Sequence, residues 1–130
     1  MPSLYKDYRI YCCVVLNRLV SELGIDIYQD ALDSKLDRVL HERPHGLSKE
    51  DIKHEIRSNH YMTEKVLSRL QEDGLITVTS DGRRYTVQIT KNGVLHLRRF
   101  NEFYKEMYRA QIADLYRFRR PPIWLDEGRD

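Results

Sequence analysis

Apolar residues recur every three or four positions in two segments of the first third of the chain. The first segment, residues 5–24, ends at Gly24, a frequent helix stop. Its apolar positions are Tyr8, Tyr11, Val15, Leu19 and Leu23. The second segment, residues 28–42, ends before Pro44 and Gly46, which disfavour further helix. Its apolar stripe consists of Leu32, Leu36, Val39 and Leu40. Both patterns predict amphipathic helices.

A third and shorter helical pattern begins at Ser48, a suitable N-cap residue. Asp51 lies three residues further on and favours a helix start by its charge, although Glu or Gln there would complete the usual capping box. Ile52 and Ile56 form the apolar side of this helix. Because so short a helix is not stable alone, it must pack on its neighbours.

The polar stretch "RSNH" separates this helix from a longer one, which Ser58 or Asn59 caps and which extends to about Asp73. Gly74 then terminates it. The predicted inward stripe consists of Thr63, Val66, Leu67 and Leu70. The residues left on the outer face or at its margins are His60, Tyr61, Glu64, Lys65, Ser68 and Arg69.

Beyond Gly74 the pattern changes to an alternation of apolar and polar residues, which is typical of strands. Residues 75–80 and 83–90 are both rich in β-branched side chains. Asp81 and Gly82 lie between them and are typical of a tight hairpin turn. The pattern therefore predicts a two-stranded hairpin with basic residues at its tip.

Thr90 caps a predicted final helix over residues 91–120, which Pro121 stops. Apolar residues recur near heptad spacing over about 29 residues, which at 1.5 Å per residue makes a helix roughly 43 Å long. Since such a helix extends beyond a domain of this size, we expect it to pack on the N-terminal helix and on a second copy of the chain. The residues predicted for this dimer interface are Tyr8, Tyr11, Val15, Leu97, Phe100, Tyr104, Met107, Leu115 and Phe118. The alternative is that the helix folds back on its own domain only.

These elements predict one domain over residues 1–130, mainly α with a small β-hairpin (α+β). Its parts are an N-terminal helix (1–27), a helix-turn-helix core with its hairpin (28–90), a long C-terminal helix (91–120) and a tail (121–130). The tail is expected to be anchored by Ile123, Trp124 and Leu125.

A two-turn helix, a short turn, a longer helix and a basic hairpin make the order of a winged helix-turn-helix. The segments "LDRVLHERPHGLSKEDIKHEI" and "VLSRLQEDGLITVTSDGRRYTVQITKNG" resemble that family. With a helix before the module and a long one after it, the chain is most similar to PadR- and MarR-type regulators of bacteria and archaea. This resemblance implies a homodimer that binds a near-palindromic operator, with two recognition helices about one DNA turn apart.

The outer face of the longer helix would then enter the major groove of double-stranded DNA, which admits a helix. The residues predicted to contact DNA are Asn59, His60, Tyr61, Glu64 and Lys65 toward the bases, Lys53, Arg57 and Arg69 toward the backbone, and Arg83 and Arg84 at the hairpin tip toward phosphates. An acid such as Glu64 accepts from cytosine but also weakens binding to DNA. The alternative for the whole set is an ordinary solvated surface.

Charge adds a modest bias toward nucleic acid. The net charge of +2 is uneven, since residues 51–100 contain nine basic and six acidic side chains. The longest apolar run, Cys12 to Leu16, is far shorter than the ~20 residues of a membrane span, so no membrane partner is predicted and the location is expected to be cytoplasmic.

Nothing in the sequence indicates an enzyme, a metal or a cofactor. Cys12 and Cys13 are adjacent, so they form no disulfide framework and are expected in the core; a redox pair lacks a second cluster. The histidines lack a metal-ligand spacing, and no nucleophile motif or Gly-rich phosphate loop occurs. No small-molecule effector is indicated; if one regulates the protein, it would bind between the N- and C-terminal helices. The main rival function is a winged helix that contacts another protein.

Overall fold

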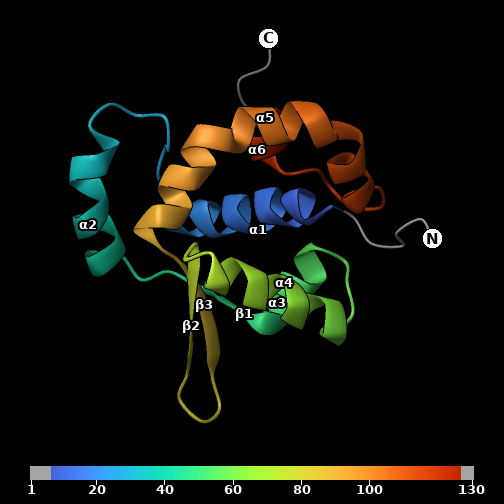
Figure 1. The fold of residues 1–130 in the computed structure, drawn as a ribbon, viewed down its shortest axis with the longest axis horizontal. Helices are drawn as coiled ribbons and strands as arrows, with labels where there is room; N and C mark the ends of the chain where they lie inside the picture. The colour runs from blue at the N-terminus through green and yellow to red at the C-terminus, as the bar shows by residue number, and fades with distance from the viewer. Residues whose placement is uncertain (1–6, 127–130) are drawn as a thin grey trace.

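The computed structural model describes residues 7–126, and helix α1 (Tyr8–Leu23) lies in the middle of them. Helix α5 (Lys91–Leu115) covers one side of α1, while α3 (Lys49–Glu55) and α4 (His60–Glu72) cover the other (Figure 1). Two further helices, α2 (Leu32–Glu42) and α6 (Ile123–Asp126), pack on α5. The fold is thus a set of helical layers around one central helix, as expected of a mainly α protein.

A three-stranded antiparallel sheet completes the fold. The predicted hairpin is confirmed as β2 (Ile76–Ser80) and β3 (Tyr85–Ile89), which projects from the helical body (Figure 1). The third strand, β1 (Leu47–Ser48), pairs with β3 in the order β1-β3-β2. The strand β1 was not predicted, because two residues are too few to show an alternating pattern. Its pairing holds the start of α3 against the base of the hairpin.

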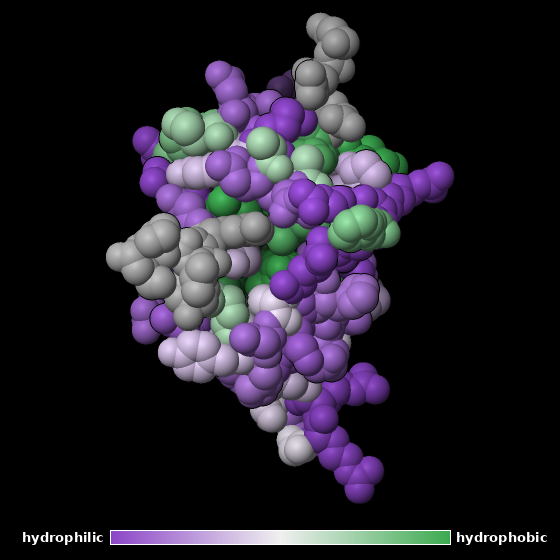
Figure 2. All heavy atoms as spheres, turned by 90° about the vertical axis from the view of Figure 1, so that its right-hand side faces the viewer, coloured by the Kyte–Doolittle hydropathy of each residue, from purple (hydrophilic) through white to green (hydrophobic). Residues whose placement is uncertain are grey.

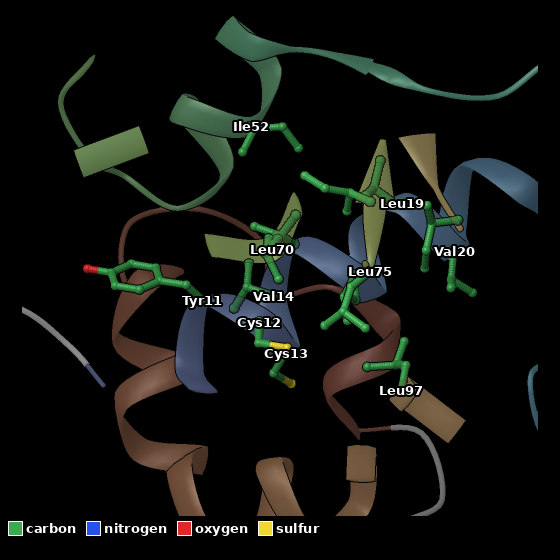
Figure 3. Packing of buried hydrophobic residues seen from close by; sticks show 14 of the residues in the cluster. Tyr11, Cys12, Cys13, Val14, Leu19, Val20, Ile52, Leu70, Leu75 and Leu97 are labelled. Atoms are coloured by element: carbon green, nitrogen blue, oxygen red, sulfur yellow. The ribbon is translucent and has the colours of Figure 1, made fainter. Parts of the chain in front are cut away.

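Helix α1 is buried on all sides rather than along one stripe. All residues from Ile10 to Asn17 are buried, as are Leu19, Val20 and Leu23. Figure 3 shows side chains of α1 surrounded by Ile52 of α3, Leu70 of α4 and Leu97 of α5. A helix that is apolar all round forms the core of a domain, so α1 is the element on which the others pack.

Cys12 and Cys13 belong to this core, as predicted. Their exposed fractions are 1% and 0%, and burial raises the pKa of both thiols to about 12. Because the thiolate is the reactive form, both groups are held in the unreactive thiol state near neutral pH.

Polar residues in the core join α1 to α5 and α5 to α6. The amide nitrogen Nδ2 of Asn17 donates to Oδ1 of Asn101 at 2.9 Å, and both residues are buried. Lys105, only 1% exposed, donates from Nζ to the carbonyl oxygen of Trp124 at 3.1 Å and pairs with Glu102 at 3.1 Å. These contacts satisfy groups that would otherwise destabilise the core and fix how α5 and α6 lie on α1.

The helix starts depend on local caps. Ser48 and Asp51 form a complete capping box, with the N–H of Asp51 donating to Ser48 Oγ at 3.0 Å and the N–H of Ser48 to Asp51 Oδ2 at 3.3 Å. Asp51 therefore completes the capping box, although Glu or Gln was expected to be needed at this position. Helix α2 begins at Leu32 rather than at Tyr28, because the N–H of Tyr28 turns back to the carboxylate of Asp26 at 2.9 Å.

The final helix differs most from the prediction. It ends at Leu115 instead of residue 120, and Tyr108 breaks its regular geometry with φ −119° and ψ 22°. The chain then turns back, so Trp124 and Leu125 are buried while Ile123 is 85% exposed. The straight rod of roughly 43 Å is therefore wrong, and two of the three expected tail anchors are confirmed.

Residues 7–126 contain neither a membrane-spanning helix nor a metal-binding cluster. No helix in this range has both the length and the apolar composition needed to cross a membrane. Within the same range, no group of three or more His, Cys, Asp or Glu side chains could hold a metal ion.

Replacing Gly93 with Ala should destabilise the fold by about 3 kcal/mol, because overpacked cores lose free energy on this scale. A Cβ atom at Gly93 would lie 2.2 Å from the carbonyl oxygen of Leu75 and 2.7 Å from Ile89 Cγ1. Urea unfolding of the variant measures the loss, with Asn92→Ala at the exposed neighbouring position as the control. Equal stability of the two variants would show that α5 does not approach Leu75 and β3 this closely.

Candidate nucleic-acid interface

Helix α4 is held by one face and leaves the other open. Its inner side packs on α1 and β2 through buried residues. They are Met62, Thr63, Val66, Leu67 and Leu70, of which only Met62 was not predicted. The hydroxyl of Thr63 also donates to the carbonyl oxygen of Asn59 at 2.8 Å, which ties the first turn to the inner side. Because rotation of α4 would expose all five, the identity of its outer face is fixed.

Asn59 is the N-cap of α4, one of the two residues predicted for that role. Its Oδ1 accepts a hydrogen bond from the N–H of Met62 at 2.7 Å. Bidentate pairing with adenine uses both the oxygen and the nitrogen of an amide, so it would remove this cap. In this position Asn59 contributes first to the helix start, and the adjacent residues are better placed to contact a ligand.

His60, Tyr61 and Lys65 stand out from the first turns of α4. The side chain of His60 is 70% exposed, and Tyr61 is 64% exposed. Lys65 is also exposed, and its Nζ lies 5.6 Å from the centre of the Tyr61 ring. This arrangement offers an aromatic ring, an imidazole and an ammonium group on one surface.

Glu64 lies among these residues but is paired with a cation, Lys49. Its carboxylate forms an ion pair with Lys49 at the start of α3, and His60 Nε2 lies 3.8 Å from it. Lys49 also stacks on Tyr85 of β3, with Nζ 4.8 Å from the ring centre. The negative charge that would repel DNA is thus locally compensated. Lys49 and Tyr85 were not predicted as part of this site. No local sequence pattern identifies them, because the contact between Lys49 and Tyr85 depends on how β3 pairs with β1.

Arg69 is separated from this group. It lies in the last turn of α4, where its Nε is 3.5 Å from the carboxylate of Asp73 and its Cζ is 4.6 Å from the centre of the Tyr8 ring. These contacts direct the guanidinium toward α1 and away from the first turn of α4. Like Asn59 and Glu64, Arg69 is thus engaged by contacts within the protein.

The hairpin carries Arg83 and Arg84 away from the body. Gly82 has φ +89° at the turn, and the N–H of Asp81 donates to the carbonyl oxygen of Arg84 at 3.1 Å. Both arginines are exposed. Figure 2 shows hydrophilic side chains extending from this projecting end. The turn is closed by its own hydrogen bonds and presents two exposed cations at the tip.

The residues predicted for a dimer interface fall into two groups. Five of them are buried within the single chain: Tyr11, Val15, Leu97, Tyr104 and Leu115. Tyr8 and Phe100 are partly buried against the same core. Only Met107 and Phe118 are exposed, at 56% and 80%. A side chain already buried by its own chain has little surface left for a partner, so the open apolar positions are Met107, Phe118 and the neighbouring Phe103.

The arrangement of α2, β1, α3, α4 and the β2–β3 hairpin agrees with a family comparison. Residues 26–101 match the family described as the DUF6293 C-terminal winged helix domain. The chain belongs to this family. The predicted winged-helix fold is therefore confirmed, with α4 in the place of the recognition helix and the hairpin as the wing.

Solved structures that are similar to this chain include the following three. The S. aureus MepR–DNA complex is 18% identical, with 77% of this chain and 72% of that chain covered and a TM-score of 0.45. MarR is 21% identical, with coverage of 85% and 76% and a TM-score of 0.41. NadR in complex with 4-hydroxyphenylacetate is 21% identical, with coverage of 90% and 88% and a TM-score of 0.42. The comparison with curated proteins found no match.

Replacing Asn59 with Ala should destabilise this winged-helix domain by about 1 kcal/mol, the usual loss for an N-cap side chain. Asn59→Ser retains an oxygen that can accept from the N–H of Met62, so its stability should stay near that of the wild type. Chemical denaturation of both variants measures the difference. If Ser destabilised as much as Ala, the role of Asn59 would not be capping.

Proposed function

We propose that this winged-helix domain is a sequence-specific regulator of transcription that binds double-stranded DNA. In this proposal α4 enters the major groove and the wing contacts the DNA backbone or the adjacent minor groove. The observation that carries it is the exposed outer face of α4 together with a projecting hairpin that carries two arginines. The role is that of a binding protein and not of an enzyme.

The dimensions of α4 suit a major groove. A helix of 13 residues is about 20 Å long, and the groove is about 12 Å wide. Side chains of its first two turns would therefore reach base edges, while the two ends of the helix backbone lie near the two DNA backbones. His60 and Lys65 supply donors for guanine or phosphate, and Tyr61 supplies a hydroxyl and an apolar ring.

The ion pair of Glu64 with Lys49 favours this function over repulsion from DNA. Lys49 and His60 flank the carboxylate, so the outer face of α4 presents no isolated negative charge at that point. Arg83 and Arg84 then provide the positive charge that phosphates attract, and this attraction supplies most of the sequence-independent affinity.

The protein is further proposed to act as a homodimer on a near-palindromic site, as in PadR- and MarR-type regulators. Support comes from the exposed apolar side chains of α5 itself, namely Phe103 and Met107. Two copies joined by this surface would present two α4 helices, and the half-sites would lie about one DNA turn apart.

A second candidate is a winged helix that binds another protein. It is favoured by the exposed Tyr61 ring and by the modest net charge of +2, which leave a surface of mixed character. Fold alone does not decide between the two functions. Whether binding depends on Arg83 and Arg84 of the wing distinguishes DNA binding from protein binding.

The variant Arg83→Ala/Arg84→Ala should lose roughly tenfold or more in affinity for duplex DNA at 0.15 M salt. Its plot of log affinity against log salt concentration should be flatter by about 1.8, since each lost phosphate contact removes about 0.9 from the slope. Fluorescence anisotropy with labelled duplex DNA at several salt concentrations measures both quantities.

The matched control is Arg38→Ala/Arg98→Ala, which removes two exposed arginines from α2 and α5. It should retain the affinity and slope of the wild type. Equal losses in the two variants would indicate only a general effect of charge. If the wild type failed to bind any duplex, the DNA-binding function would be wrong and the protein-binding alternative would stand.

A further inference from the structure

A hollow of about 610 Å³ lies beside the start of α4. It is formed by α3, the turn between α3 and α4, and the segment that follows α5. Its lining residues are Glu50, Lys53, His54, Arg57, Ser58, Phe118 and Arg119. In Figure 1 the turn that precedes α4 lies at the opposite end of that helix from the β2–β3 hairpin. The hollow and the wing therefore lie at the two ends of α4.

The hollow has an excess of positive charge. Arg57 Nη1 donates to the carbonyl oxygen of Asp114 at 3.4 Å, and Arg119 Nη2 donates to that of Leu115 at 3.0 Å. Carbonyl oxygens orient these guanidinium groups but do not neutralise them. Lys53 pairs with Glu50 at 3.5 Å, so the lining has three permanent cations and one carboxylate. Such a surface favours an anionic partner.

An exposed aromatic ring stands between the cations. Phe118 is 80% exposed, and its ring centre lies 5.8 Å from Cζ of Arg57 and 5.7 Å from Cζ of Arg117. Stacking on a ring restricts where a guanidinium points, which reduces the entropy lost when it binds a phosphate. Figure 2 views the molecule from this side, where hydrophilic side chains surround isolated hydrophobic ones.

The backbone of Arg57 is in a conformation that favours glycine. Its φ is +50°, and it follows the last turn of α3, where the N–H of Ser58 donates to the carbonyl oxygen of Lys53 at 3.2 Å. This hydrogen bond is that of a Schellman motif, in which the residue at this position is usually Gly. A non-glycine residue is strained there, and such strain is concentrated at functional sites. The observation suggests that the side chain of Arg57 is needed.

We propose that Arg57, Phe118 and Arg119 form a second backbone clamp, which binds DNA phosphates next to the start of α4 and across the major groove from the wing. This inference rests on the proposed DNA-binding function. A helix of about 20 Å that lies in a groove about 12 Å wide passes under both backbones. The wing holds one backbone, and the hollow adjoins Ser58 and Asn59 where the other would pass. Guanidinium groups contact the phosphates, and the Phe118 ring packs on deoxyribose.

The decisive variant is Arg57→Gly, because the expected effects on folding and on binding have opposite signs. Gly relieves the strain at φ +50°, so the midpoint of thermal unfolding should equal or exceed that of the wild type. The lost phosphate contact should weaken duplex binding about fivefold at 0.15 M salt and flatten the salt slope by about 0.9. Arg57→Lys, which keeps the charge, should recover part of the affinity.

Two further variants complete the experiment. Phe118→Ala removes an exposed ring and should weaken DNA binding without loss of stability. Ala31→Gly relieves the other non-glycine residue with positive φ within residues 7–126, at 57°, in α2's N-cap position. It should raise or preserve stability and leave the salt slope of the wild type, which separates relief of strain from loss of the guanidinium.

The outcomes distinguish this inference from the function on which it rests. Wild-type affinity and slope in Arg57→Gly, with the wing variant still defective, would overturn the clamp and leave DNA binding intact. Absence of duplex binding by the wild type would overturn both. A polyglutamate peptide that binds the wild type but not Arg57→Gly, together with an unchanged DNA slope, would instead assign the hollow to an acidic protein segment and overturn the clamp.

Discussion

The burial of one face of α4 is the constraint on which the rest depends. Five side chains of that helix are packed on α1 and β2, so the helix cannot turn without exposing apolar surface. Loss of even one large buried side chain typically destabilises a domain by about 2–5 kcal/mol. The opposite face is therefore held outward as a rigid surface. This surface extends from Asn59, the N-cap of α4, to the hairpin that follows the C-terminal end of the helix.

The central helix α1 explains why this surface is so well supported. It is buried all round and packs against α3 and α4 on one side and α5 on the other. The paired amides of Asn17 and Asn101 set one position of α5 on α1, since any other leaves buried polar groups unpaired. As a result, residues that look like a dimer seam along α5 serve the core of one chain. A partner would meet only the side chains that α1 does not cover.

Local features were predictable from the sequence, and long-range ones were not. Ser48, Thr90 and Asp81-Gly82 act through residues three or fewer positions away, so the caps and the turn were predicted correctly. The strand β1, the break at Tyr108 and the pairing of Lys49 with Glu64 depend on contacts between distant segments. For the candidate site, the outer face of α4 was predicted from its periodicity. The hollow was missed because it forms only where the chain turns back after α5.

Selection of bound duplexes from a random DNA pool at near-physiological salt tests the central claim most directly, because it needs no assumption about the site. If α4 reads bases and two copies act together, the recovered sequences should share a motif with two-fold symmetry and half-sites about one DNA turn apart. Recovery of no common motif, or equal enrichment by the Arg83→Ala/Arg84→Ala variant, would contradict the account.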